Sequence, residues 1–244
     1  MNEVMFSIIT VTYNSEDTVR NTIESVLNQT YKNYEYIIVD GNSKDNTLNI
    51  IKEYEERFEG KLKYISEPDS GIYDAMNKGI RMAKGKIIGI INSDDWYEKE
   101  ALENVINEYQ GDDYIVYYGY MRTIDKMNGK EIRCAIYSHE YIEEMMINHP
   151  TVFVNKKVYE EFGLFNCEYK SSADYELMIR YVREKKIKFI PILKIQANFR
   201  TGGMSDSSDA LCETMKIKKK YGYMNTFQYI ASIIYLKGRK LMRY

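Results

Sequence analysis

Short apolar runs alternate with segments of helical periodicity through the first hundred residues. The apolar runs cover residues 6–12, 34–40, 62–66 and 86–92. Between them, apolar side chains recur at the spacing of one helical face in residues 15–29, 43–58 and 71–85, and Gly85 is placed to end the third segment. Strands that are apolar along their length and alternate with helices are typical of a parallel sheet covered on both faces. The sequence therefore predicts a three-layer α/β/α fold.

The alternation ends near residue 100, and a mixed pattern follows. Residues 114–125 and 130–138 indicate antiparallel strands joined at Asn128 and Gly129, a pair that favours a tight turn. The later predicted elements are a short helix over 139–147, a strand over 151–155, a helix from near Ser172 and a strand over 187–200. No stretch rich in Gly, Ser or Pro marks a linker. We expect one domain over residues 1–222, followed by a tail.

Polar residues follow the predicted strands where each strand ends. Residues 12–14 (TYN) end the first strand, Asp40 ends the second, and Asn92, Ser93, Asp94 and Asp95 follow the fourth. Ligands of open α/β sheets bind outside the carboxyl ends of the strands, so this edge is the expected site. Adjacent carboxylates there suit Mg²⁺ or Mn²⁺ together with substrate phosphates. The alternative is that Ser93 or Asp94 caps a helix starting near Trp96, a residue expected to pack rather than bind.

The composition fits a globular protein with a buried core, since 44% of the residues are hydrophobic and 29% are charged. The cysteines, Cys134, Cys167 and Cys212, are too far apart for a disulfide framework or a paired metal site, so we expect buried free thiols. Met1 leads almost directly into the first strand without a signal peptide, and no apolar run has the length of a membrane span. We expect a cytoplasmic protein with no nucleic acid among its partners.

The tail, residues 223–244, differs in charge from the rest of the chain. From Thr214 to Tyr244 there are eight Lys or Arg and no acid, whereas the first 213 residues hold 26 basic and 36 acidic side chains. Its apolar positions are Phe227, Ile230, Ile233, Ile234 and Leu241. Basic amphipathic segments can lie on anionic membranes, so we expect contact with the inner face of the cell membrane. The alternatives are packing on the body or pairing with a second subunit in a homodimer.

Five segments in order resemble the family 2 glycosyltransferases of the GT-A fold. They are SIITVTYN (7–14), IIVDGNSKDNT (37–47), DSGIYDAMNKGI (69–80), GKIIGIINSDDW (85–96) and SADYELMIRY (172–181). The resemblance covers roughly residues 5–205 and is closest to bacterial enzymes that build capsule, O-antigen or exopolysaccharide. It implies a Rossmann-like, mostly parallel sheet with a mixed C-terminal half. It also implies a nucleotide-sugar-binding half of about residues 1–97 and an acceptor-binding half of about residues 98–222.

By this resemblance, four residues at the sheet edge would bind the nucleotide-sugar. Tyr13 would stack on the base, and Asp40 would accept a hydrogen bond from a uracil ring. Asp94 would contact the ribose, and Asp95 would ligate a divalent metal, Mn²⁺ or Mg²⁺, that bridges the diphosphate. The alternatives are a structural role for Tyr13, one of 24 tyrosines, and a turn-capping role for Asp40.

Residues 67–79 border the donor in the resembling family, and the expected donor-binding residues there are Asp69, Asp74 and Asn77. Asp74 and Asn77 are one helical turn apart and can face the same side. Many family members carry an arginine before this asparagine, where the chain has Met76, so the cation that meets the pyrophosphate is left open. The alternative for Asp74 is an ordinary acid at a helix N-terminus.

The resemblance places the general base at Asp174, because transfer to a hydroxyl requires a nearby proton acceptor. The family often has Glu-Asp where this chain has Ala173 and Asp174. The alternative is that Asp174 caps the helix that begins here. His149 and Arg200 are expected near the acceptor or the diphosphate, with a structural histidine and an exposed arginine as alternatives. Residues 199–208 are expected to form a mobile loop that closes over the donor.

The resemblance therefore implies metal-dependent transfer of a sugar from a nucleotide-sugar to an acceptor hydroxyl. Inversion would occur by direct displacement, with UDP expected and GDP or dTDP as alternatives, and the acceptor would be a saccharide or a lipid-linked saccharide. A non-catalytic nucleotide-sugar or partner-binding protein is the main alternative. A nucleotidyltransferase is less favoured, because residues 12–18 contain no glycine for a phosphate loop.

Overall fold

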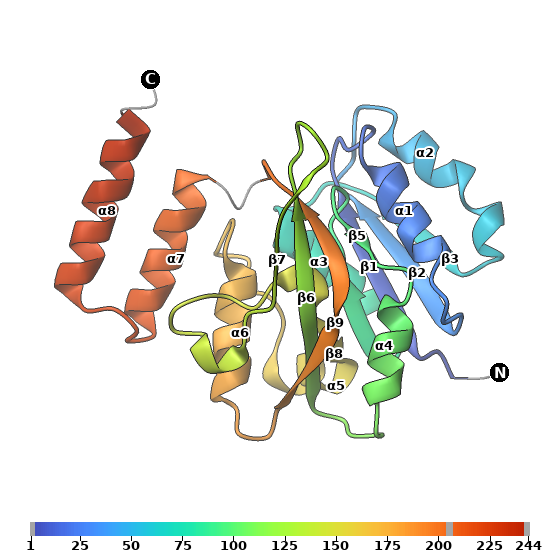
Figure 1. Cartoon of the computed structure of the whole chain (residues 1–244). Coiled ribbons are helices and arrows are strands. Elements are labelled where there is room, and N and C mark those ends of the chain that lie inside the picture. The colour runs from blue at the N-terminus through green and yellow to red at the C-terminus, as the bar shows by residue number, and fades with distance from the viewer. Residues whose placement is uncertain (1–2, 204–206, 242–244) are drawn as a thin grey trace.

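The computed structural model describes residues 3–203 and 207–241. Within these residues one nine-stranded sheet has the order β3-β2-β1-β4-β8-β6-β9-β5, and β7 pairs with β6 (Figure 1). The strands are β1 (Phe6–Thr12), β2 (Tyr34–Asp40), β3 (Leu62–Ser66), β4 (Ile87–Ile90), β5 (Trp96–Tyr97), β6 (Ile115–Ile124), β7 (Glu131–Ala135), β8 (Phe153–Asn155) and β9 (Lys188–Arg200). β1 to β4 are mutually parallel where they pair, and the remaining strands make the sheet mixed. The predicted α/β fold is confirmed.

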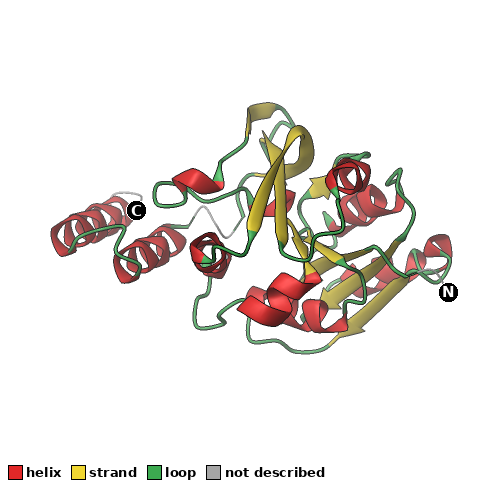
Figure 2. Cartoon of the chain, turned by 90° about the horizontal axis from the view of Figure 1, so that it is seen from below, coloured by secondary structure: helices red, strands yellow, loops and turns green. Residues whose placement is uncertain are grey.

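Helices cover both faces of this sheet (Figure 2). The helices that pack on the sheet are α1 (Val19–Leu27), α2 (Thr47–Glu53), α3 (Ile72–Met82), α4 (Ala101–Glu108), α5 (Lys156–Phe162) and α6 (Ala173–Arg183), whereas α7 (Ser208–Lys220) and α8 (Thr226–Leu241) lie beside it. The 3₁₀ turns are η1 (Glu56–Phe58), η2 (His139–Tyr141) and η3 (His149–Thr151). One core packs α1, α2 and α4 on the sheet, and the other packs α3, α5 and α6. Neighbours such as Ile8 and Ile9 are both fully buried, one in each core, because successive side chains leave a strand on opposite faces.

The register of the first strands brings their carboxyl ends to one edge. Thr12 pairs with Asp40, and Asp40 pairs with Ser66. β4 pairs with β1 in parallel, and the Ile91 N–H then donates to the Ile9 carbonyl at 2.9 Å. Residues 92–95 therefore leave the sheet at the same edge as the ends of β1, β2 and β3.

The predicted hairpin between β6 and β7 is confirmed. The two strands pair antiparallel, and the Gly129 N–H closes the turn on the Asp125 carbonyl at 2.8 Å. Gly129 has a φ of +70°, a conformation that side-chain-bearing residues rarely adopt. The strand predicted over 187–200 is β9, which pairs with the whole of β6.

The helix predicted to begin near Trp96 is wrong. Trp96 and Tyr97 form β5, a two-residue strand antiparallel to Asn198 and Ala197 of β9, and α4 begins only at Ala101. A partner strand a hundred residues away decides this conformation, and the local sequence carries no sign of it.

Gly85 does not end the preceding helix. α3 ends at Met82, and Ala83 is already extended. A Cβ at Gly85 would lie 2.5 Å from the backbone of Phe6, and the Gly85 N–H donates to the Ser7 hydroxyl at 2.8 Å. Glycine is required here because the chain passes close to β1.

Other helix boundaries also differ from the prediction. The helix predicted over 43–58 is divided into α2 and η1, and the one predicted over 139–147 is reduced to the single turn η2. α5 and α7 were not predicted. The cysteines are free but not buried, since Cys134 is exposed and Cys167 and Cys212 are half-buried.

The C-terminal helices α7 and α8 form a hairpin beside the sheet domain (Figure 1). α7 packs on the body through the buried Ile217, and the Arg183 guanidinium from α6 donates to the Tyr221 carbonyl. α8 packs on α7. Among the described residues, no helix combines the length and the apolar character needed to cross a membrane.

Candidate active site

Tyr13, Asp40 and Asp69 meet at the ends of β1, β2 and β3. A Cβ at Gly41, the residue after β2, would lie 2.6 Å from Asp69 Oδ2 and 3.4 Å from Tyr13 Cδ2. The bare backbone of Gly41 therefore lets the carboxylate and the ring approach each other. Tyr13 is 61% exposed, so its ring offers a flat, accessible face of the kind on which a planar base can stack.

Asp40 is fully buried, and both of its carboxylate oxygens have partners. Oδ2 accepts from the Ser66 hydroxyl at 2.6 Å and from the Ser43 N–H at 3.0 Å, while Oδ1 accepts from the Ser43 hydroxyl. The turn-capping alternative is thus what the structure shows. A contact with a base remains a prediction, and it would add to these bonds.

Asp74 and Lys78 fasten the loop over residues 67–71 to α3. The Ser70 N–H donates to Asp74 Oδ2 at 3.1 Å, and Lys78 lies 3.6 Å from the same oxygen. Lys78 also pairs with Glu67 at 2.9 Å, and that hydrogen bond raises the pKa of the ammonium group. Asp74 therefore serves the loop as an N-terminal helix acid, which was the alternative reading, and the loop in turn presents Asp69.

Asn77 faces a different partner from Asp74. Its Nδ2 donates to the Phe165 carbonyl at 2.9 Å, and its Oδ1 accepts the Phe165 N–H at 3.1 Å. Nδ2 also lies 3.3 Å from the Cys167 sulfur. Because this amide is buried and bonded on both sides, it positions the loop before α6 on α3.

Asp94, Asp95 and Arg200 form the second group at the sheet edge. The Arg200 N–H donates to Asp95 Oδ1 at 3.0 Å, and Arg200 Nε donates to the Asp94 carbonyl at 3.1 Å. The guanidinium lies 5.1 Å from the centre of the Trp96 ring. Arg200 ends β9, and the expected closing loop begins only after it. Residues 204–206 of that loop lie outside the described residues, and Ser208 already belongs to α7.

Ser93 joins the two groups. Its hydroxyl shares a 2.8 Å hydrogen bond with the Ser15 hydroxyl, which follows β1. The Thr22 hydroxyl from α1 donates to the Asp95 carbonyl at 2.6 Å. Neither Ser93 nor Asp94 caps a helix, so that alternative is wrong.

Asp95 is a buried acid at this edge with only one of its two carboxylate oxygens hydrogen-bonded among the described residues. It is fully buried, and Oδ2 has no hydrogen-bond partner within the described part of the chain. Burial raises the pKa of the carboxyl well above its ordinary value, and the neighbouring Asp94 raises it further. Burial also raises the pKa of Asp94 itself. Buried carboxylates are normally paired or bound to metal, so a cation is the expected missing partner.

The residues present fit a hard divalent cation. Asp95 Oδ2 is a buried carboxylate oxygen without a partner, and the Asn92 Oδ1 atom nearby in sequence is likewise buried and unbonded among the described residues. The described residues contain no group of three His, Cys, Asp or Glu side chains at ligand spacing. One or two carboxylates are enough where substrate phosphates complete the coordination of Mg²⁺.

Asp174 stands in the first turn of α6, and a tyrosine from α3 meets it. The Tyr73 hydroxyl donates to Asp174 Oδ1 at 2.8 Å, and the Tyr175 N–H donates to the same oxygen at 3.0 Å. Tyr73 lies inside the segment 69–80, yet its role was not predicted. Since Tyr73 is two residues after Gly71, whose N–H donates to Asp69, the start of α3 connects the loop at the sheet edge to Asp174.

A residue from α7 caps the start of the helix that carries Asp174. The Glu213 carboxylate accepts the backbone N–H groups of residues 170–172 at 2.6 to 2.9 Å. Ser172 is the N-cap of α6, and its hydroxyl donates to the Ala210 carbonyl on α7. The alternative that Asp174 is the N-cap is therefore wrong. No sequence signal pointed to Glu213.

His149 lies in η3, edge-on to Phe165 at 6.0 Å between ring centres. Burial lowers its pKa, while the charge of Asp174 opposes that shift. Its Nε2 is buried and has no hydrogen-bond partner among the described residues. His149 therefore lies close enough to Asp174 to feel its charge, with one ring nitrogen unsatisfied among the described residues.

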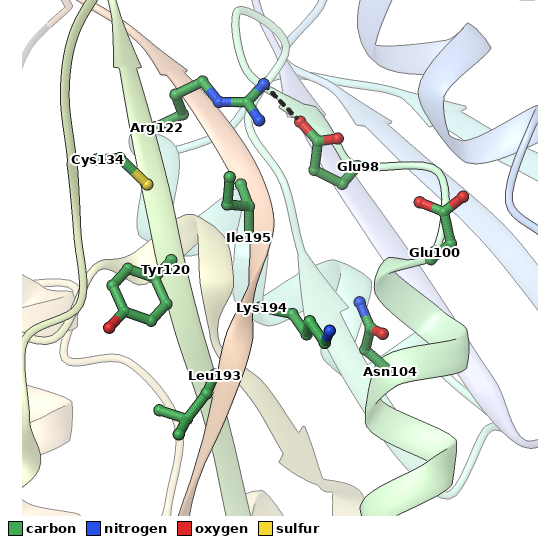
Figure 3. Close-up of a pocket in the computed structure, with 9 residues that line it drawn as sticks. All are labelled: Glu98, Glu100, Asn104, Tyr120, Arg122, Cys134, Leu193, Lys194 and Ile195. Carbon is green, nitrogen blue, oxygen red and sulfur yellow. Dashed lines mark hydrogen bonds and ion pairs between the residues drawn. The ribbon is translucent and has the colours of Figure 1, made fainter.

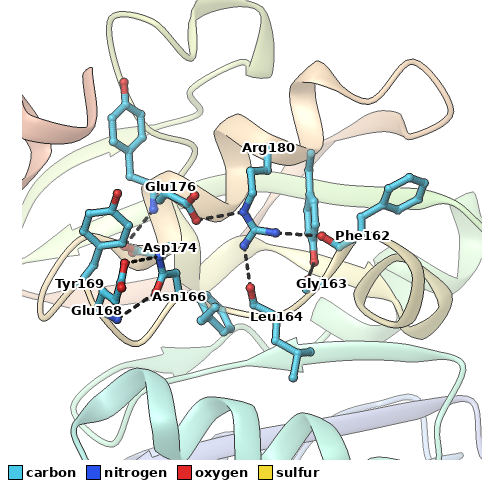
Figure 4. A network of polar contacts seen from close by, with 12 residues as sticks. Phe162, Gly163, Leu164, Asn166, Glu168, Tyr169, Asp174, Glu176 and Arg180 are labelled. Atoms are coloured by element: carbon cyan, nitrogen blue, oxygen red, sulfur yellow. Dashed lines mark hydrogen bonds and ion pairs between the residues drawn. The ribbon is translucent and has the colours of Figure 1, made fainter. Parts of the chain in front are cut away.

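A polar network behind Asp174 fixes the loop before α6 (Figure 4). Arg180 donates to the Phe162 and Leu164 carbonyls at 2.8 and 2.6 Å and to Glu176 at 3.0 Å. Glu176 is 3% exposed and points away from Asp174 into this network, as its position in the helix predicts.

A groove of about 580 Å³ lies between α4 and the strands β6 and β9, away from these groups (Figure 3). Arg122 and Glu98 form an ion pair at its rim, 3.0 Å apart. None of the residues implicated by the sequence lines it, so we place the candidate site at the sheet edge, where the buried Asp95 carboxylate has one oxygen without a partner among the described residues.

Comparison with known proteins identifies the family. The model of the family described as glycosyl transferase family 2 matches residues 7–164. The chain belongs to glycosyl transferase family 2. This confirms the family that the five sequence segments indicate.

Relatives of this family 2 chain carry glycosyltransferase names. It is 31% identical over 199 residues to an uncharacterized glycosyltransferase of Rickettsia prowazekii, a match that covers 76% of the chain and 61% of the relative. It is 29% identical over 180 residues to chondroitin synthase of Escherichia coli, covering 72% of the chain and 26% of the synthase. The chain thus spans less than two thirds of these relatives.

Solved structures show the same fold in the family 2 chain. Residues 1–349 of S. aureus TarS, in complex with UDP-GlcNAc, align with a TM-score of 0.69 at 21% identity, covering 93% of the chain and 69% of that structure. A mannosyltransferase from Pyrobaculum calidifontis, in complex with GDP-Man and Mn²⁺, aligns with a TM-score of 0.70 at 14% identity, covering 97% and 70%. The predicted GT-A fold is confirmed.

Proposed function

We propose that the protein transfers a sugar from a nucleotide-sugar to an acceptor hydroxyl. The observation that carries the proposal is the fully buried Asp95 with an unpartnered oxygen, at the edge where Tyr13 and Asp69 also gather. A buried carboxylate without a partner destabilises a protein unless it serves a ligand. Membership of family 2 supports this reading.

The donor would lie along the ends of β1, β2 and β4. The Tyr13 ring would stack on the base, Asp40 and Asp69 would lie beside it, and Asp94 would meet the ribose. UDP is the proposed nucleotide, which a structure of the same fold with UDP-GlcNAc supports, although another such structure binds GDP-Man. The sugar itself is not part of the proposal.

Asp95 would hold Mn²⁺ or Mg²⁺ through Oδ2, with the donor diphosphate completing the coordination. When bound, the metal ion supplies positive charge that stabilises the departing diphosphate. Asp95 Oδ1 would stay on the Arg200 N–H, which fixes the orientation of the carboxylate.

Asp174 would act as the general base. Its Oδ1 is occupied by Tyr73 and by the Tyr175 N–H, whereas Oδ2 makes no hydrogen bond within the described residues. The acceptor oxygen would bond to the anomeric carbon while the bond from that carbon to the diphosphate oxygen breaks. The hydroxyl proton would pass to Asp174 Oδ2. A single displacement of this kind inverts the anomeric configuration.

The proposed acceptor is a saccharide of a bacterial surface polysaccharide, carried on a lipid at the inner face of the cell membrane. The outward face of α8 supports this location. Phe227, Ile230 and Ile234, spaced as one helical stripe, are 81%, 51% and 66% exposed. Ile233 and Leu236 instead line the contact with α7.

Charge favours an anionic lipid surface as the occupant of this stripe. Residues 214–244 hold eight Lys or Arg and no acid. Each basic residue near an anionic membrane contributes about 1 kcal/mol, so several together would retain the protein there. We expect the full chain to sediment with vesicles containing phosphatidylglycerol and to stay in solution with phosphatidylcholine alone.

The double change Ile230→Asp and Ile234→Asp should abolish that sedimentation. Leu193→Asp is the matched control, because Leu193 is an apolar residue of the body that is 72% exposed. The membrane proposal is wrong if the wild type does not sediment with anionic vesicles but forms a dimer that the double change dissociates. The stripe would then be a subunit interface.

The transfer proposal is tested by a screen of nucleotide-sugars with Mn²⁺ or Mg²⁺. Metal-dependent release of UDP from one donor, faster when an acceptor saccharide is added, is the expected result. If UDP with Mn²⁺ raises the melting temperature of the protein but no donor is hydrolysed or transferred, the protein is a non-catalytic binding protein.

A further inference from the structure

Tyr73 is the one described side chain that donates a hydrogen bond to Asp174. Its hydroxyl lies 2.8 Å from Oδ1, and the backbone N–H of Tyr175 supplies the second donor to the same oxygen. Two donors on one oxygen fix the plane of a carboxylate and leave the other oxygen, Oδ2, available.

The Tyr73 ring is itself held in place. It is 5% exposed and stacks on Phe165, with 5.5 Å between ring centres and 28° between ring planes. The Phe165 backbone is bonded in both directions by Asn77, which lies one turn after Tyr73 on α3. The hydroxyl therefore has a defined direction before any substrate arrives.

We propose that Tyr73 is the positioning residue of the general base: it holds the Asp174 carboxylate so that Oδ2 faces the acceptor hydroxyl. This inference rests on the proposed function and adds to it a contact that couples the donor-side helix α3 to the acceptor-side helix α6.

The groups around Asp174 are compatible with this role. Burial raises the pKa of Tyr73, and the charge of Asp174 raises it further, so the phenol remains a protonated donor. The other titratable neighbours are His149 from η3, whose pKa is lowered by burial, and Glu213 from α7, which is bonded to the backbone of residues 170–172. Neither of these forms a hydrogen bond with the Asp174 carboxylate among the described contacts.

The test is the split between kcat and KM when Tyr73→Phe transfers the sugar in the full chain. Loss of one hydrogen bond to the carboxylate should lower kcat roughly tenfold. The KM for the nucleotide-sugar should stay near that of the wild type, because the Tyr73 hydroxyl is bonded to Asp174.

Tyr181→Phe is the matched control. This tyrosine, on α6, is buried like Tyr73, and its hydroxyl donates to the Gly163 carbonyl at 2.7 Å instead of to Asp174. The control should lose comparable stability and keep kcat near that of the wild type. If both variants lose kcat equally, Tyr73 is merely structural and the proposal is overturned.

A double-mutant cycle separates this inference from the proposed function. Adding Tyr73→Phe to Asp174→Asn should cause no further loss of the residual rate, because the partner is already gone. If Tyr73→Phe does not fold, Phe165→Leu, which keeps the hydroxyl and removes the stacking, should also lower kcat and leave the KM for the nucleotide-sugar unchanged. Wild-type kinetics in Tyr73→Phe, with Asp174→Asn inactive, would overturn the inference alone. A wild type that transfers no sugar overturns both.

Discussion

Arg200 and Asp95 lie 105 residues apart in sequence and are joined by one hydrogen bond, from the Arg200 N–H to Asp95 Oδ1 at 3.0 Å. A backbone donor at the end of β9 thus orients a carboxylate that follows β4. The bond satisfies one oxygen and leaves the other, buried and unbonded among the described residues, for a ligand. Any residue except proline at position 200 would supply this backbone donor.

Asp95→Asn should weaken metal-dependent UDP binding and yet stabilise the metal-free protein. Removing a metal ligand should raise the Kd for UDP with Mn²⁺ roughly tenfold or more. Removing a buried charge with an unpartnered oxygen should raise the free energy of unfolding by about 1 kcal/mol at pH 8 in chelator. Titration calorimetry and urea unfolding measure the two effects.

Asp40→Asn is the control for that stability gain. Its carboxylate oxygens are all bonded, to Ser43 and Ser66, so the change places a donor against a donor and should lower stability. If Asp95→Asn lost as much stability as Asp40→Asn, Asp95 would be an ordinary structural acid.

Asp174→Asn should lower kcat roughly a hundredfold to ten-thousandfold while UDP binding persists, because the proton acceptor is lost and the donor edge is unchanged. Steady-state kinetics and UDP titration check this. Glu176→Gln is the comparison: Glu176 is a buried acid two residues away that bonds Arg180, so the change should cost stability and spare kcat. Near-wild-type turnover in Asp174→Asn would show that the base lies elsewhere.

Glu213→Ala should destabilise the start of α6. It removes the acceptor of the N–H groups of residues 170–172, and unsatisfied donors of this kind cost about 1–3 kcal/mol. The urea midpoint should fall, and kcat should fall with it because Asp174 follows directly. Glu168→Ala, an exposed acid bonded to Asn166, should change neither. Equal midpoints for the two variants would contradict the capping role.

Glu35→Gln tests an acid-sensitive contact in the sheet. Burial would raise the pKa of Glu35, but hydrogen bonds from Lys63, Ser7 and the Lys84 N–H outweigh it, so the pKa is lowered. Because the pKa of Glu35 is lower in the folded state than its ordinary value of 4.5, the ionised side chain stabilises the folded state at pH values above 4.5. This stabilisation is lost as the pH falls through the folded-state pKa. Glu35→Gln should therefore be about 1 kcal/mol less stable at pH 7, with the difference closing below pH 4.5.

The matching control is Glu53→Gln, since Glu53 is an exposed partner of Arg20. Exposed ion pairs contribute little, so its unfolding free energy should follow the wild type from pH 7 to acid. If the free energies of unfolding of the wild type and Glu35→Gln differed by the same amount at every pH, the shape of the side chain at position 35 would matter and its ionisation would not.

The first three strands were predicted to the residue. β1 and β2 are buried along their whole length and β3 is half-buried, but each is a short run rich in apolar residues that ends before polar ones. The placement of Asp40 and Asp95 at one edge of the sheet also follows from the pattern, because a parallel sheet brings strand ends together. The misses share a different cause. β5 forms because it pairs with β9, and position 85 requires glycine because the backbone of Phe6 lies too close for a side chain. Neither partner is near in sequence.

The site residues that sequence reasoning missed also depend on distant partners. Tyr73 was inside a recognised segment, but only the fold shows that its hydroxyl bonds to Asp174. Asn77 was expected to face the donor with Asp74, whereas its amide matches the backbone of Phe165. Glu213 has no periodic or motif signal, because one carboxylate on an ordinary amphipathic helix becomes a cap only when that helix docks.

Helix α7 has a consequence for how the protein can be shortened. It carries Glu213, which caps the start of α6, and α8 packs on it. A chain cut in the connection between α7 and α8, after Tyr223, would lose the exposed apolar stripe of α8 and keep the cap. A chain cut sixteen residues earlier, before Ser208, would lose Glu213 as well, and three backbone N–H groups at the start of α6 would lose their acceptor.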